Sequence, residues 1–185
     1  MNENIKKTIV VNIMGGPSAG KSTAAAGVFY DLKRKFVNVE LVTEYAKDKV
    51  WQETTNILSN QIYVFGKQHN RIFHLKNKVD VIVTDSPFIM GLVYADYDIV
   101  SPSFEQLVVD EFIREDVINL NYVIKRVRRY VPEGRLQDEA GAKKKDEEIL
   151  DLLKTHDINY TILKGKESTV PLIIDDIISL LEIEG

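Results

Sequence analysis

The sequence of 185 residues contains no cysteine, which excludes disulfide bonds and cysteine-ligated zinc sites. The same absence agrees with a reducing compartment, so we expect a cytoplasmic protein. No apolar run approaches the roughly 20 residues that span a bilayer, and the polar residues 1–7 lack the apolar core of a signal peptide. We therefore expect no association with a membrane.

The sequence also has fewer positive than negative residues, with 24 Lys and Arg against 28 Asp and Glu, so its formal net charge is −4. This balance argues against a general basic coat for nucleic acid, although a local basic cluster occurs late in the chain. The sequence also lacks repeats, low-complexity tracts and interdomain linkers. Its length predicts one domain, residues 1–185, with a hydrophobic core of its own.

Apolar, β-branched segments alternate five times with amphipathic segments. The predicted strands are residues 8–14, 39–43, 79–84, 120–125 and 160–163, and the predicted helices are residues 21–35, 54–78, 103–118, 138–156 and 168–182. Ser103 is a predicted N-cap, with Gln106 at capping-box spacing. The alternation is typical of an α/β fold of three layers, with a five-stranded, mostly parallel sheet and helices on both faces. Right-handed crossovers place the carboxyl ends of such strands along one edge, where ligands bind.

The most specific motif follows the first predicted strand and matches G-x-x-x-x-G-K-[ST], the Walker A phosphate-binding loop or P-loop. Its glycines let the backbone curl so that successive N–H groups point at one anion, and the next helix directs its positive end there. Lys21 is predicted to reach the outer phosphates of ATP and Ser22 to hold Mg²⁺. The predicted cofactor-binding residues are Gly15, Pro17, Ser18, Ala19, Gly20, Lys21, Ser22 and Thr23.

Two carboxylates end the second and third predicted strands, at the edge where ligands bind. Glu44 is expected to accept a proton from a substrate hydroxyl or to hydrogen-bond a sugar, and its alternative role is a helix-start carboxylate. Asp85 is expected to orient the water shell of Mg²⁺, as in a Walker B site, or to act as the base. Its alternative role is a turn residue before Ser86-Pro87.

A basic cluster begins at the end of the fourth predicted strand and contains Lys125, Arg126, Arg128, Arg129 and Arg135. Arginine forks suit phosphate oxygens, and the segment contains Pro and Gly, so it is expected to close over the nucleotide as a lid, about residues 126–145. Its alternative role is a solvated basic loop. The charge run 143–148 within the next helix is expected to be a solvated face.

Four further candidate side chains come between the two carboxylates in the sequence. Gln61, Gln68 and Arg71 are polar enough to read a base or sugar, with a solvated face as the alternative. Trp51 either stacks on a nucleobase or packs ordinarily.

The chain resembles the P-loop superfamily of nucleoside and nucleotide kinases, and within it the small phage-type and nicotinamide-riboside-kinase-like proteins often labelled AAA-type ATPases. The segments that carry the resemblance are GGPSAGKST at 15–23, VTEYA at 42–46, TDSP at 84–87 and RRYVPEGRLQDEA at 128–140. The resemblance implies that Lys21 and Ser22 bind phosphate and Mg²⁺, that Glu44 or Asp85 lies at the acceptor, and that lid arginines cover the phosphates.

Two departures leave the class of acceptor open. Deoxynucleoside kinases have an acidic-Arg-Ser motif where this chain has Asp85-Ser86-Pro87, and nucleoside monophosphate kinases carry Gly at the position of Ser18.

We expect phosphoryl transfer from ATP·Mg²⁺ to a nucleoside-like or nucleotide acceptor, mainly by positioning and charge neutralisation. The predicted catalytic residues are Lys21, Glu44, Asp85, Arg128, Arg129 and Arg135, and the predicted metal ligands are Ser22 and Asp85. The alternatives are a kinase of a modified base, such as hydroxymethyluracil in phage DNA, and a nucleotide-binding switch or ATPase without an acceptor. The long apolar helices allow a homodimer as well as a monomer.

Overall fold

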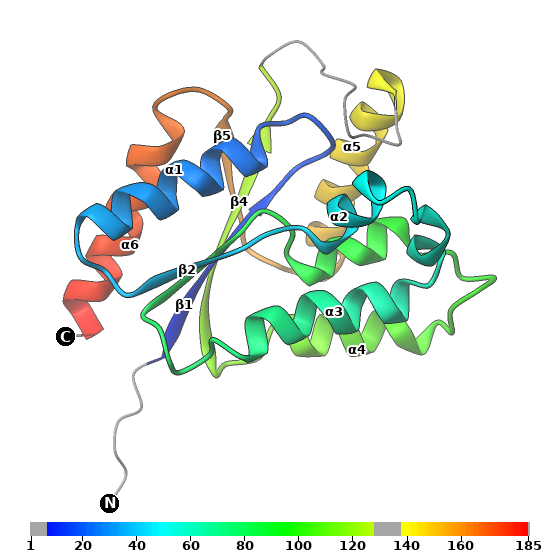
Figure 1. Cartoon of the computed structure of the whole chain (residues 1–185), viewed down its shortest axis with the longest axis horizontal. Coiled ribbons are helices and arrows are strands. Elements are labelled where there is room, and N and C mark those ends of the chain that lie inside the picture. The colour runs from blue at the N-terminus through cyan, green and yellow to red at the C-terminus, as the bar shows by residue number, and fades with distance from the viewer. Residues whose placement is uncertain (1–6, 128–137, 185) are drawn as a thin grey trace, which may run out of the picture.

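The computed structural model describes residues 7–127 and 138–184 and contains one five-stranded sheet (Figure 1). The strand order is β2-β3-β1-β4-β5, and every strand pair in the described ranges is parallel. The strands are β1 (Thr8–Met14), β2 (Val39–Val42), β3 (Val81–Thr84), β4 (Val117–Lys125) and β5 (Thr161–Lys164). The predicted α/β fold with a parallel sheet is confirmed.

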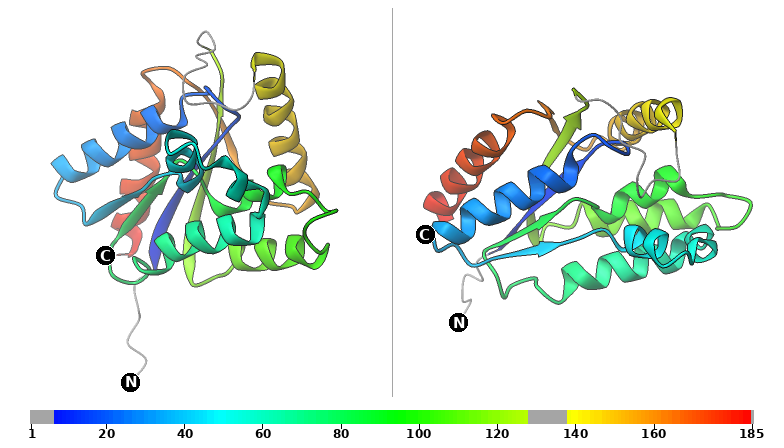
Figure 2. Two further views of the ribbon diagram at one scale, coloured as in Figure 1. Left: turned by 45° about the vertical axis from the view of Figure 1, so that its right-hand side comes forward. Right: turned by 45° about the horizontal axis from the view of Figure 1, so that its top comes forward.

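Helices cover both faces of this sheet, so the molecule has three layers (Figure 2). The helices are α1 (Lys21–Arg34), α2 (Tyr45–Trp51), α3 (Gln61–Phe73), α4 (Ser103–Phe112), α5 (Glu139–Thr155) and α6 (Thr169–Glu184), with 3₁₀ segments η1 (Thr55–Ser59) and η2 (Phe88–Tyr94). Helices α1 and α6 pack on one face, and α3, α4 and α5 lie on the other. None of the helices in these ranges is both long and apolar enough to cross a membrane.

The central strand β1 explains why two cores form. All seven of its residues are buried, as expected for a strand covered on both faces. Because side chains alternate along a strand, Ile9 and Val11 join the core under α1 and α6, while Val10 and Met14 join the core under α3, α4 and α5.

The predicted helix 54–78 is wrong at both ends. Asn60 interrupts it, because the Asn60 side chain accepts a hydrogen bond from the Tyr63 N–H (3.1 Å) and caps α3. At the other end α3 stops at Phe73, and Asn77 takes a positive φ of 60° in the following turn. Asparagine adopts the N-cap and the positive-φ conformation more readily than most residues, which explains why α3 begins after one asparagine and ends before another.

The predicted helix 103–118 is also too long, since α4 ends at Phe112 and β4 begins at Val117. The Asn119 side chain donates to the carbonyl of Phe112 (2.9 Å) and so satisfies the end of the helix. The predicted cap at Ser103 is wrong as well: Ser103 is the first helical residue, and Gln106 donates to Asp110 (2.8 Å) instead of closing a capping box.

Several apolar residues in or next to the helices are about half or more exposed. They are Ile62, Phe73, Leu107, Ile113 and Leu172. A surface helix buries only one stripe, so apolar residues at the margin of that stripe remain in contact with water.

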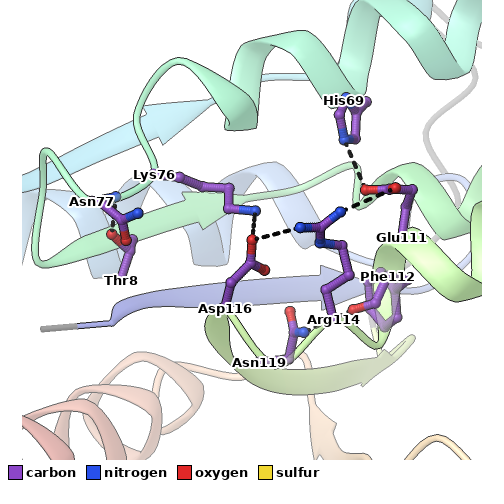
Figure 3. A network of polar contacts seen from close by, with 9 residues as sticks. All are labelled: Thr8, His69, Lys76, Asn77, Glu111, Phe112, Arg114, Asp116 and Asn119. Carbon is purple, nitrogen blue, oxygen red and sulfur yellow. Dashed lines mark hydrogen bonds and ion pairs between the residues drawn. The ribbon is translucent and has the colours of Figure 1, made fainter. Parts of the chain in front are cut away.

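A polar network ties α3 and α4 to the start of β4, at the end of the sheet away from the P-loop (Figure 3). Lys76 Nζ lies 2.5 Å and Arg114 Nη2 lies 3.3 Å from Asp116 Oδ2, and Arg114 also pairs with Glu111. Burial on its own would raise the pKa of the Asp116 carboxyl, but Lys76 and Arg114 outweigh burial and hold that pKa below its ordinary value.

Candidate active site

The P-loop connects the end of β1 to the start of α1 through a backbone that requires glycine. Gly15 and Gly20 have φ of 143° and 101°, in the region that favours glycine. A Cβ on Gly15 would also lie 2.9 Å from the carbonyl oxygen of Ile124. The motif therefore has the tight curl that the sequence predicted.

Ser18 adopts a backbone conformation that favours glycine. Its φ is 65°, a left-handed conformation that a side chain disfavours by about 1 kcal/mol or more. This is the position where the resembling nucleoside monophosphate kinases carry glycine, so the backbone here keeps a glycine-like conformation without the glycine.

Helix α1 begins directly behind the loop with its N–H groups directed at it. Gly20 occupies the N-cap without any side-chain cap, and the first turn contains no acidic residue. Lys21 Nζ folds over the loop and donates to the carbonyls of Gly15 (2.8 Å) and Gly16 (3.1 Å). Uncapped helix N–H groups next to a lysine form a site with positive potential, which suits phosphate.

One cavity of about 440 Å³ lies against this loop at the carboxyl end of the sheet. Residues 17–23 of the P-loop, Glu44 and Asp85 all line it. Its other walls come from α2, η1, α3 and η2 and include Gln61, Gln68, Phe65, Phe88, Met90 and Tyr94. The predicted loop and both predicted carboxylates thus converge on one cavity, large enough for a drug-sized ligand.

Asp85 follows β3 and is 4% exposed, and its Oδ1 atom has no hydrogen-bond partner in the described structure. A buried carboxylate oxygen without a donor is costly unless a cation or a ligand donor reaches it. Mg²⁺ prefers such hard oxygen ligands and uses few protein groups beside water and phosphate. The Asp85 carboxylate and the Ser22 hydroxyl, which line the same cavity, therefore fit a magnesium ion.

Glu44 occupies the N-cap position of α2, but its side chain makes no capping hydrogen bond. It is half-buried on the cavity wall. Burial raises the pKa of the Tyr94 phenol, and the negative charge of the nearby Glu44 carboxylate raises it further; both side chains line the cavity. Tyr94 ends the apolar segment 88–94, whose composition is compatible with either a pocket wall or core packing.

The polar residues expected to read a base instead support the segment that carries Glu44. Gln68 accepts from the N–H of Tyr45 (3.1 Å) and donates to the carbonyl of Thr43 (3.3 Å). Arg71 donates to the same Thr43 carbonyl (2.8 Å). These two side chains of α3 therefore fix the backbone on both sides of Glu44.

Gln61 is the exception among these residues. Its Nε2 donates to the carbonyl of Leu58 (2.7 Å), which fixes the orientation of the amide, and its buried Oε1 has no hydrogen-bond partner in the described structure. Trp51, by contrast, is 65% exposed and does not line the cavity.

The lid prediction is only partly accessible, because Arg128, Arg129 and Arg135 lie outside the described residues. Within the range 126–145 the structure describes residues 126–127 and 138–145, and residues 139–145 form the beginning of α5. The charge run 143–148 is a solvated face only in part: Lys143, Lys144 and Glu147 are exposed, but the two residues between them make contacts with the rest of the fold. Asp146 accepts from the Gly16 N–H (2.6 Å), and Lys145 donates to the Val93 carbonyl (2.6 Å).

The comparisons with known proteins agree with this geometry. A family model described as an AAA domain matches residues 10–169. The chain is similar in structure to deoxyadenosine kinase from M. mycoides with the products dCMP and a flexible dCDP bound, with a TM-score of 0.56 and 17% identity over 92% of this chain and 99% of that one.

The same enzyme with bound dATP gives a TM-score of 0.56 and 17% identity over 91% and 98% of the two chains. With bound dCTP it gives 0.52 and 16% over 92% and 99%. No curated protein matches the sequence. The chain therefore has the fold of the P-loop nucleoside and nucleotide kinases and belongs to the AAA domain family.

Proposed function

We propose that the protein transfers a phosphoryl group from ATP·Mg²⁺ to a nucleoside or nucleotide acceptor, with a nucleoside hydroxyl as the first choice. The observation that carries this proposal is the shared cavity: the P-loop, Glu44 and Asp85 line it together. A switch needs the P-loop but not a second carboxylate in the same cavity. The deoxynucleotides bound in the similar structures support a deoxynucleoside as the acceptor.

The P-loop side of the cavity binds the donor in this proposal. Lys21 and the N–H groups of the loop and of the first turn of α1 hold the phosphates. When bound, Mg²⁺ neutralises charge on the phosphate oxygens, and Ser22 and Asp85 are the side chains that would hold it. Arg128, Arg129 and Arg135 are proposed to neutralise the transferring group.

The opposite wall orients the acceptor. Glu44 accepts the proton of the acceptor hydroxyl, whose oxygen forms a bond to the γ-phosphorus while the bond from that phosphorus to the bridging oxygen of ADP breaks. The products are ADP and the phosphorylated acceptor, and Glu44 then releases the proton to solvent. Gln68 and Arg71 contribute by holding the Glu44 segment in place.

The experiment is ATP consumption with Mg²⁺ against a panel of nucleosides, deoxynucleosides, nucleoside monophosphates, nicotinamide riboside, and plain or hydroxymethylated DNA, with Lys21→Ala as the inactive control. Turnover with one small acceptor supports the proposal and identifies the substrate. Turnover only with modified DNA would replace it with the DNA-kinase alternative. ADP binding without turnover on any acceptor would replace it with a nucleotide switch.

A further inference from the structure

One turn of α5 contacts both halves of the candidate site. In Figure 1 the loop after β1 reaches α5. Two hydrogen bonds to Asp146 of α5 connect this helix to the loop and to the end of β4. Asp146 Oδ1 accepts from the backbone N–H of Gly16 (2.6 Å), and Asp146 Oδ2 accepts from Arg126 Nη2 (2.9 Å). Asp146 thus joins the phosphate loop to the end of β4.

Gly16 shows how close this contact is. A Cβ at that position would lie 2.5 Å from the Ala142 carbonyl and 2.6 Å from Asp146 Oδ1, closer than real Cβ contacts allow. The motif G-x-x-x-x-G-K-[ST] leaves this position unspecified. Its φ is outside the positive range, so the glycine here is required by α5 and not by the curl of the loop.

The ion pair with Arg126 also holds Asp146 in place. The Arg126 side chain is 9% exposed, and its Nε and Nη1 atoms have no hydrogen-bond partner in the described structure. A buried guanidinium needs an anion, and Asp146 is the carboxylate that meets it. Asp146 is therefore held in place from one side while it holds Gly16 from the other.

The preceding residue, Lys145, contacts the acceptor wall. Its Nζ donates to the carbonyl of Val93 (2.6 Å) and lies 4.8 Å from the centre of the Tyr94 ring. Tyr94 lines the same cavity as Glu44. We refer to Lys145 and Asp146 together as the α5 brace.

We infer that Asp146 is a positioning residue that keeps the P-loop in its nucleotide-binding conformation, and that Lys145 positions the acceptor wall from the same turn. Without the Asp146 bond the loop samples other conformations, and the apparent affinity falls by the fraction of loops still competent to bind. A charge-assisted hydrogen bond is worth enough to change this fraction by about tenfold or more. The role of Asp146 requires only nucleotide binding, whereas the role of Lys145 rests on the proposed function.

The test measures ADP·Mg²⁺ binding by calorimetry, together with the thermal midpoint of the nucleotide-free protein. Asp146→Ala is expected to weaken ADP binding about tenfold. Asp146→Asn keeps an acceptor for Gly16 and is expected to lose less. Glu147→Ala, an exposed neighbour on the same helix, is the matched control and should bind ADP like the parent protein.

A second variant separates loop positioning from an unpaired buried charge. Arg126→Met combined with Asp146→Ala removes both charges, and ADP binding should remain about tenfold weaker while the thermal midpoint recovers. ADP affinity equal to the parent in this folded double variant would overturn the inference, because the Gly16 contact is absent in it.

The proposed role of Lys145 is tested by a separate measurement, the KM for the acceptor. Lys145→Met is expected to raise the KM for the acceptor several-fold and to leave ADP affinity unchanged. An unchanged acceptor KM, or an equal loss of ADP affinity, would contradict this half. If no acceptor is turned over by the parent protein, the proposed function fails, yet the ADP measurements still decide the role of Asp146.

Discussion

Replacing Gly16 with alanine tests whether the P-loop is fitted to α5. The added Cβ would lie 2.5 Å from the Ala142 carbonyl and 2.6 Å from Asp146 Oδ1, so either the loop or the helix must move. Overpacking of this kind costs about 1–3 kcal/mol. At roughly 2–4 °C per kcal/mol for a chain of this size, the midpoint of thermal unfolding should fall by about 2–12 °C.

The matched control is Gly66→Ala in α3, where a Cβ would have nothing within 4 Å. Alanine is favoured over glycine inside a helix by about 1 kcal/mol, so this change should raise the midpoint by a few degrees. The assay is thermal unfolding by circular dichroism, repeated with saturating ADP. Gly16→Ala should also weaken ADP binding. A Gly16→Ala protein as stable and as avid for ADP as the parent would refute the account of the contact, since the motif alone allows any residue there.

Three further predictions concern the loop, the Glu44 segment and the polar network. Ser18→Val should weaken ADP binding while Ser18→Gly should not, because a β-branched residue strongly disfavours a φ of 65°; equal affinities would contradict this. Gln68→Leu should lower stability by about 1–3 kcal/mol in urea unfolding, because the buried Tyr45 N–H loses its acceptor; an unchanged midpoint would argue against it. Asp116 has a lowered folded-state pKa, so its stabilising effect is present above the unfolded pKa of about 3.9 and disappears as pH falls through the folded value. The stability difference between the parent and Asp116→Asn, under about 1 kcal/mol for this partly exposed pair, should therefore shrink below about pH 4, and a constant difference would contradict it.

The local parts of the site could be predicted from the sequence because their signals are local. A buried strand, a glycine turn with Lys21-Ser22 and a helix follow one another within 27 residues, and the structure has all three where expected, from Thr8 to Arg34. Glu44 and Asp85 could be placed in the same cavity because parallel strands with right-handed crossovers present their carboxyl ends together.

The helix boundaries were harder, because they depend on side chains that compete for backbone groups. Asn60 caps α3 inside a stretch whose apolar spacing continues across it, and Asn119 satisfies the end of α4 from the next strand. Periodicity detects the stripe of a helix but not a single amide that ends it.

The brace was missed because it is a tertiary contact within a charged run. Asp146 looked like a solvated residue among lysines and glutamates, yet it lies four residues after Ala142 and three before Ile149, both fully buried. That spacing puts Asp146 on the inner face of α5 and was the available signal. Its partner, the Gly16 N–H, lies 130 residues away and could not be identified without the fold.

The most direct test of the central claim is a comparison of Glu44→Gln with the parent protein on the accepted nucleoside. Glutamine keeps the size of the side chain but cannot take a proton, so phosphoryl transfer should fall by about 10²- to 10⁴-fold while ADP·Mg²⁺ affinity stays unchanged. This result would show that donor binding and acceptor activation are separate tasks within one cavity. A Glu44→Gln protein that phosphorylates the nucleoside at the parent rate would contradict the account.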